Sequence, residues 1–150
     1  MSEILVPISA GELLDKITIL RIKSRRIQDE GKLANVRREL EALERTRREA
    51  LAGAPAGSAG RDALDADIAA LERVNATLWD IEDRIREHEA AGRFDAAFIE
   101  LARAVYRRND ERAAIKRRIS QALGSALLEE KSYRPYGGPY GVVDTDRGDA

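Results

Sequence analysis

The chain has 150 residues, enough for one domain with a sizeable core, and 35% of them are charged while only 5% are aromatic. The 27 acidic and 26 basic residues nearly cancel, so no overall basic field favours nucleic acid as a partner. The absence of cysteine excludes disulfides, thiolate metal sites and cysteine nucleophiles. We see no signal peptide and no apolar run near the roughly 18 residues of a membrane span, so a cytoplasmic protein without membrane insertion is expected.

The first predicted helix begins near Ala10. Ser9 and Glu12 fit the S-x-x-E capping box, in which each side chain satisfies a backbone donor at the start of a helix. The same stretch, SAGELLDK, also admits a glycine-containing ligand loop, but the cap accounts for it without a ligand. The helix is expected to end near Asp29. It is apolar on more than one face, which indicates a central position or a second surface used by another chain.

Three further helices follow from apolar residues at steps of three and four and from local start and stop signals. Their predicted ranges are Lys32–Leu51, Asp62–Ala91 and a last helix capped by Asp95 that ends near Gly124. The stretch AGAPAGSAG at 52–60 breaks every pattern and is predicted to be a flexible surface connection.

The last two helices are expected to pack as an antiparallel hairpin across Gly92, with residue i level with residue 185 minus i. Their charges are complementary, because residues 62–91 hold nine acids and three bases while residues 93–118 hold eight bases and four acids. The predicted fold is all-α, an antiparallel four-helix bundle with a long coiled-coil-like hairpin. It occupies residues 1–131, and residues 132–150 form an extended or disordered tail.

No known catalytic or metal-binding signature is present. His88 is the single histidine, and neither a Glu-x-x-His pair nor a zinc ligand set can be built around it. Glycine-rich phosphate loops and the nucleophile elbow are also missing. We therefore expect His88 to be an ordinary surface or boundary residue, and we expect no cofactor and no metal ion.

One feature exceeds what a plain bundle requires, namely a layer of polar side chains that interrupts the apolar stripes. Buried charges are costly unless they are paired, so something must satisfy this layer. Three arrangements would satisfy it. In the first, Glu82 pairs with Arg108 or Arg112 and buried asparagines fix the register of the helices. In the second, the excess cations line a site for a small anion, and in the third the helices are rotated so that these side chains reach solvent. The candidate residues are Lys16, Arg21, Asn75, Glu82, Arg108, Asn109, Arg112 and Lys116.

The tail contains three tyrosines next to two prolines: Tyr133, Tyr136 and Tyr140. As an extended segment it would suit the groove of a partner protein. The alternatives are that the tail is disordered or folds back on the bundle.

Four segments resemble an uncharacterised bacterial family of small all-helical proteins, known as a domain of unknown function. They are VPISAGELLDKITILRIKSRRI, VNATLWDIEDRIR, FIELARAVYRRNDERAAIKRRI and EEKSY, and the match as a whole runs from about Ile4 to Tyr133. The resemblance implies a bacterial source, a helical fold and genes that lie near those for surface-polysaccharide glycosyltransferases, but no activity. A weaker similarity to the all-helical chorismate mutases rests on LLDKITILRIKSRRI and requires a first helix that continues through Asp29.

The leading functional hypothesis is a non-enzymatic interaction or scaffold protein, because catalytic motifs are missing and helical surface is abundant. A homodimer is expected through the second apolar face of the first helix or through the hairpin, and a further protein partner fits the same surfaces. The alternative is a small-anion-binding protein or a helical mutase-like enzyme that uses the polar layer. Nucleic acid is disfavoured, because the acidic third helix neighbours the basic fourth.

Overall fold

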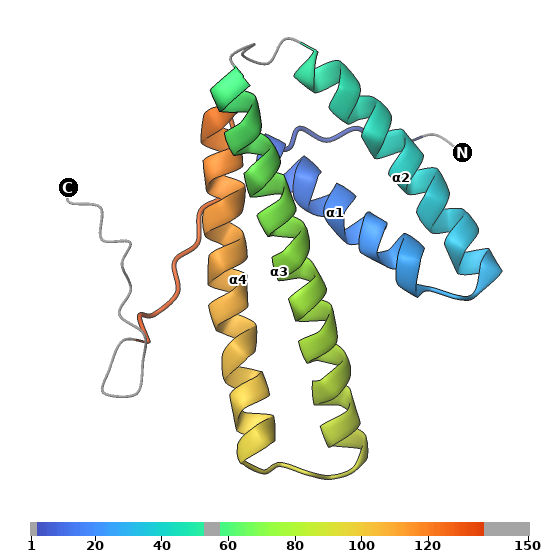
Figure 1. The fold of residues 1–150 in the computed structure, drawn as a ribbon, viewed down its shortest axis with the longest axis vertical. Helices are drawn as coiled ribbons and strands as arrows, with labels where there is room; N and C mark the ends of the chain where they lie inside the picture. Colours follow the sequence, from blue (N-terminus) through green and yellow to red (C-terminus); the bar gives the residue numbers. More distant parts are fainter. Residues whose placement is uncertain (1–2, 53–57, 137–150) are drawn as a thin grey trace.

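The chain folds into four α-helices (Figure 1). The structure, a computed structural model, describes residues 3–52 and 58–136. The helices are α1 (Ala10–Arg26), α2 (Glu30–Leu51), α3 (Ser58–Ala90) and α4 (Ala96–Ala122), and the described residues contain no strand. The predicted all-α bundle is confirmed. No helix in these ranges combines the length and apolar character that a membrane crossing requires.

Helices α3 and α4 form the predicted antiparallel hairpin. Gly92 lies at the turn with φ 63°, a left-handed conformation that glycine adopts without steric cost, and the Asp95 side chain caps α4 by accepting the Phe98 amide at 3.0 Å. Arg118 Nη2 lies 2.7 Å from Asp67 Oδ1 across the hairpin. Since these two residue numbers sum to 185, the predicted register is confirmed.

Helix α1 occupies the centre of the molecule, between α2 on one side and the hairpin on the other (Figure 1). Its contacts with all three other helices explain why it is apolar on more than one face. Ile22 is buried, and α2 packs on α1 without a comparable contact to α3 or α4. The second apolar face of α1 is therefore covered by α2 within the chain. The largest fully buried apolar side chains are Leu14, Ile17, Ile22, Leu71 and Ile119.

Two predicted boundaries differ from the structure. Helix α1 ends at Arg26 rather than near Asp29, because the Asp29 side chain accepts the Lys32 amide at 2.8 Å and so caps α2 instead. The long first helix that the chorismate mutase similarity requires is thus interrupted. Residues 58–60 belong to α3, since a formed helix extends by another turn at little cost. Ala52 follows the end of α2 as its C-cap, and the remainder of the predicted flexible connection, 53–57, lies outside the described residues.

The chain after α4 returns along that helix without regular secondary structure. Gly124 has φ 63° and ends the helix, as its position in the sequence predicts. Residues 126–136, which we call the C-terminal segment, place Tyr136 against the ring of Tyr106, with ring centroids 4.7 Å apart. This part of the tail folds back on the bundle, whereas Tyr140 lies outside the described residues.

Candidate functional site

The beginning of α1 is held by three serine hydroxyls. The amides of residues 10, 11 and 12 donate to Ser125 Oγ at 3.0 Å, Ser120 Oγ at 2.9 Å and Ser9 Oγ at 3.2 Å. Because these amides have no acceptor within their own helix, the three hydroxyls satisfy donors that would otherwise need water or a ligand. The predicted helix start is confirmed, and two of its three caps come from the distant end of α4.

Gly11 allows this end of α1 to lie directly on the backbone of α4. A Cβ atom at Gly11 would lie 2.3 Å from the Lys116 carbonyl oxygen and 2.8 Å from Ser120 Oγ. Both distances are far below a normal van der Waals contact, so residue 11 must be a glycine for the two helices to meet at this spacing. The glycine serves helix packing and not a ligand loop.

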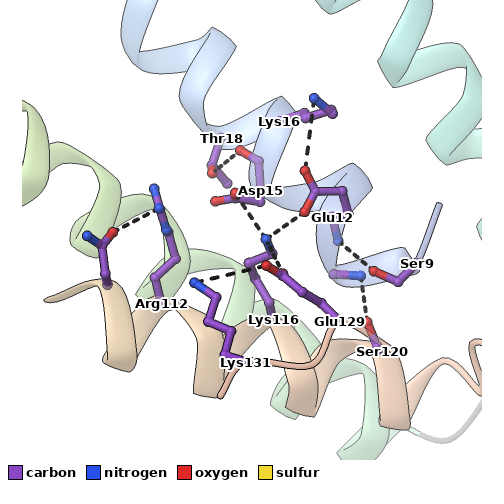
Figure 2. A network of polar contacts seen from close by, with 12 residues as sticks. Ser9, Glu12, Asp15, Lys16, Thr18, Arg112, Lys116, Ser120, Glu129 and Lys131 are labelled. Carbon is purple, nitrogen blue, oxygen red and sulfur yellow. Dashed lines mark hydrogen bonds and ion pairs between the residues drawn. The ribbon is translucent and has the colours of Figure 1, made fainter. Parts of the chain in front are cut away.

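Lys116 lies at the centre of a group of carboxylates (Figure 2). Its Nζ atom lies 2.6 Å from Glu12 Oε2, 2.7 Å from Glu129 Oε2 and 3.5 Å from Asp15 Oδ2. The Lys116 side chain is only 10% exposed. A buried ammonium group normally requires such partners, because its desolvation is costly when it is unpaired.

Asn75 joins this group to the hairpin. Its Nδ2 atom donates to Asp15 Oδ1 at 2.8 Å and to Thr18 Oγ1 at 3.0 Å. Its Oδ1 atom accepts from Arg112 Nη1 at 3.2 Å, and Arg112 Nη2 donates to Asn109 Oδ1 at 2.8 Å. Asn75 therefore uses both ends of its amide to connect α1, α3 and α4.

These side chains form one connected cluster, which we call the polar network. Its three cations, Arg112, Lys116 and Lys131, balance three carboxylates. Lys131 Nζ lies 4.0 Å from Glu129 Oε1 and stands at the edge. The charges thus compensate one another inside the chain. The members of the polar network are Glu12, Asp15, Thr18, Asn75, Asn109, Arg112, Lys116, Glu129 and Lys131.

The polar network shifts the pKa values of two of its members. Burial alone would lower the pKa of Lys116, but hydrogen bonds to Glu12 and Glu129 and the charge of Asp15 outweigh burial and raise it above its ordinary value of 10.5. The hydrogen bond from Lys116 lowers the pKa of Glu129 below its ordinary value of 4.5, against the opposing effect of partial burial, with further help from Lys131 and Arg112. Both shifts favour the charged pair.

The contact of Glu129 with Lys116 is expected to depend on pH. Because the pKa of Glu129 is lower in the folded chain, its stabilising contribution is present above 4.5 and is lost as the pH falls through the lower folded value. Since the Glu129 side chain is 42% exposed, Glu129→Gln should cost no more than about 1 kcal/mol near neutral pH. Urea unfolding of both proteins should show this difference near about pH 7 and not near about pH 3. A difference that persisted at the acidic end would contradict an electrostatic origin.

The structure brings four of the eight candidate residues together: Asn75, Asn109, Arg112 and Lys116. Two others lie elsewhere, because Glu82 pairs with Arg86 at 2.6 Å and Arg108 with Glu111 at 2.7 Å, both near the surface. The expected pairing of Glu82 with Arg108 or Arg112 is wrong. The hairpin extends past the end of α1 (Figure 1), so side chains near its turn border solvent.

The two candidates on α1 lie outside the centre of the cluster. Arg21 turns to the other side of its helix, where it forms ion pairs with Glu44 of α2 and, at 4.0 Å, with Glu72 of α3. Lys16 touches the polar network only through Glu12, at 3.9 Å, and is largely exposed. Arg21 therefore fastens α2 and α3 to α1, and Lys16 is a surface cation.

The sequence interpretation missed the acidic half of the polar network. The missed side chains on α1 repeat at helical spacing, at 12, 15 and 18, and the polar stripe on α4 continues from the predicted Arg112 and Lys116 to Ser120. A polar stripe of this kind on an otherwise apolar helix could have indicated, from the sequence alone, that these side chains meet inside the bundle. Glu129 lies after the end of α4, outside any helical repeat, so no spacing pattern in the sequence pointed to its position. The members of the polar network that were not predicted for this layer are Glu12, Asp15, Thr18, Glu129 and Lys131.

Two hollows adjoin this end of the bundle. The smaller, about 20 Å³, lies beside Lys116 and Glu129 and holds little more than one water molecule. The larger, about 350 Å³, we call the terminal groove. It lies between the N-terminal residues, the start of α1 and the ends of α2 and α4. Its lining consists of Val6, Ile8, Ser9, Ala10, Leu13, Leu14, Thr46, Ala50, Leu51, Leu123 and Ser125.

His88 belongs to the hairpin turn and not to either hollow. Its ring lies against Phe98, with centroids 6.1 Å apart, and Nδ1 lies 3.1 Å from the Arg93 carbonyl oxygen. The side chain is almost buried, so it supports the turn as a structural boundary residue.

No protein-family model matches this chain, and no curated protein or solved structure is significantly similar to it.

Proposed function

We propose that this protein is a non-enzymatic helical interaction protein that associates with a second copy of itself through the terminal groove. The observation that carries this proposal is a run of exposed aliphatic side chains beside that groove. Ile4, Leu5 and Val6 are 87%, 89% and 66% exposed. We call residues 4–8 the aliphatic arm. Three consecutive large aliphatic residues in water are unfavourable, and a contiguous apolar surface of this kind indicates a protein contact.

The lining of the terminal groove supports an aliphatic occupant. None of its eleven lining residues is charged, although 35% of the whole chain is. Because the lining carries no charge, it cannot form ion pairs with an acidic or basic partner. It can bury aliphatic side chains without leaving a charge unpaired. Its volume of about 350 Å³ has room for more than one such side chain.

The geometry favours a second copy as the occupant because groove and arm lie at the same end of one chain. Val6 and Ile8 already form part of the groove wall, whereas Ile4 and Leu5 lie outside the lining and are free to reach another molecule. Two copies related by a twofold axis would each supply one arm and one groove. Such an interface is self-complementary and closes on itself, as in most homodimers.

This proposal predicts the effect of a charge in the aliphatic arm. Leu5→Asp should raise the dimer dissociation constant about 100-fold or more, because two leucines per dimer lose about 1.5 kcal/mol or more each. Light scattering and sedimentation over a concentration series measure this directly. Ile99→Asp is the control, since Ile99 is also exposed but lies at the far end of the hairpin. A wild-type chain that stays monomeric throughout, or equal effects of both variants, would overturn the proposal.

The resemblance to a bacterial helical family supports a setting for this association. On that basis we propose surface-polysaccharide synthesis as the process in which the protein takes part. Deletion of the gene should then alter the amount or length of surface polysaccharide, and complementation with Leu5→Asp should fail while Ile99→Asp restores it. Restoration by both variants would separate this process from self-association.

A further inference from the structure

We propose that Lys116 and its neighbours form a recognition site for a small carboxylate, and that Glu129 of the same chain occupies this site as an internal ligand. This proposal is independent of self-association through the terminal groove. It rests on the position of Glu129 between Lys116 and Lys131, on the weak attachment of the C-terminal segment and on the cationic lining of the hollow beside it.

Glu129 differs from the other two carboxylates that surround Lys116. Glu12 and Asp15 belong to α1, and Asp15 is buried and also accepts a hydrogen bond from Asn75. Glu129 comes from a segment without regular structure, and its side chain is 42% exposed. Its carboxylate nevertheless lies 2.7 Å from Lys116 Nζ, as close as a strong charged hydrogen bond allows. Among these three acids, Glu129 is the one that can leave while the helices stay packed.

The C-terminal segment is held to the helices mainly by side chains. Glu130 lies 3.1 Å from Arg117, and this exposed pair contributes little stability. Within the described part of the chain, residues 126–135 make no backbone–backbone hydrogen bond to a helix. Removal of the segment therefore breaks ion pairs and ring contacts but no secondary structure, so a competing anion faces a small energetic barrier.

Departure of Glu129 would leave a site with an excess of positive charge. The hollow beside Lys116 is also lined by Arg117, a cation that remains on α4, and by the hydroxyls of Ser9 and Ser120, whereas Lys131 belongs to the departing segment. Glu129 is the single carboxylate in that lining. With a volume of about 20 Å³ the hollow admits no ligand beside Glu129, so a ligand must take the place of its carboxylate.

The chemistry of Glu129 identifies the class of ligand. A carboxylate from another molecule would accept the same hydrogen bond from Lys116 and replace the negative charge that Glu129 contributes there. A dicarboxylate would in addition reach Arg117, whose present partner Glu130 leaves with the segment. When one carboxylate replaces another, the net charge around Lys116 does not change, so Glu12 and Asp15 keep their ion pairs with Lys116.

Calorimetric titration with succinate tests the proposal. Glu129→Ala should bind succinate at least tenfold more tightly than the wild-type protein, because the internal competitor is gone. Glu111→Ala is the matched control, since it removes an equally exposed carboxylate that pairs with Arg108 and leaves Lys116 and Arg117 as they are, and its affinity should stay within twofold of wild type. Equal succinate affinity of Glu129→Ala and wild type would overturn the proposal, as would tighter binding of inorganic phosphate than of succinate to Glu129→Ala.

Two further measurements separate ligand binding from a loss of structure. In the Glu129→Ala background, Arg117→Ala should weaken succinate binding several-fold while the circular dichroism spectrum is unchanged, because Arg117 lines the hollow from an exposed position on α4. In the wild-type protein, saturating succinate should accelerate trypsin cleavage after Lys131 as the segment leaves α4. Unchanged affinity in the first measurement, or slower cleavage in the second, would contradict displacement of Glu129.

Discussion

Gly11→Ala is expected to destabilise the protein by about 3 kcal/mol and to lower its melting temperature by roughly 10 °C. The added Cβ would lie 2.3 Å from the carbonyl oxygen and 2.8 Å from the carbonyl carbon of Lys116. Backbone atoms cannot move aside as a flexible side chain does, so α1 must shift away from α4. The shift would also break the hydrogen bond from the Gly11 amide to Ser120. Thermal and urea unfolding followed by circular dichroism measure the loss.

The control for this prediction is Gly60→Ala in α3. A Cβ at Gly60 meets nothing within 4 Å, and alanine is favoured over glycine in a helix by roughly 0.5–1 kcal/mol. Gly60→Ala should therefore be neutral or slightly stabilising. If Gly11→Ala behaved like Gly60→Ala, the close approach of α1 and α4 would be wrong.

Lys116→Met is expected to cost about 3 kcal/mol, within the range for removal of one partner from a buried ion pair. Methionine fills a similar volume but leaves the buried Asp15 and the half-buried Glu12 without their cation. Part of the cost should disappear at acidic pH, because the stabilising contact with Glu129, whose pKa the ion pair with Lys116 lowers, is lost as the pH falls through that lowered value. Urea unfolding of the variant and the wild-type protein at neutral and acidic pH would show both effects.

Lys16→Met is the matched control, because Lys16 also faces Glu12 but from solvent. Lys16 Nζ lies 3.9 Å from Glu12 Oε1 and its side chain is 49% exposed, so its loss should change stability by less than about 0.5 kcal/mol. A large effect of Lys16→Met, or a small one of Lys116→Met, would show that burial does not control the strength of the polar network.

The parts of the fold that depend on local chemistry were predictable from the sequence. Ser9 and Asp95 were identified as helix caps because a capping side chain bonds to an amide only three residues away. The hairpin register followed from the single turn at Gly92, and the contact of Asn75 with Arg112 agrees with it. In each case the relevant partner is close in sequence or fixed by one short turn.

The acidic half of the polar network was not predicted because it depends on how α1 is rotated against the hairpin. The first helix is apolar on two faces, so its pattern does not show which side meets α4. Asp15 and Thr18 face Asn75 only because Gly11 brings α1 close to α4 at one particular angle. Glu129 depends on the path of a segment without periodicity. Glu82 was placed inside because the sequence does not show that the hairpin outruns α1.

The serine caps of α1 have a consequence for the order in which the protein folds during synthesis. The amides of residues 10 and 11 bond to hydroxyls 115 and 109 positions later in the chain. Helix α1 therefore leaves the ribosome before α2, α3 and α4 but is completed only when Ser125 has emerged. Until then α2 and α3 can pack on α1, but the start of α1 lacks its contacts with the end of α4, and contacts between such distant residues form slowly. Nascent chains halted before Ser125 should consequently be more sensitive to proteases within residues 10–26 than chains halted well beyond it.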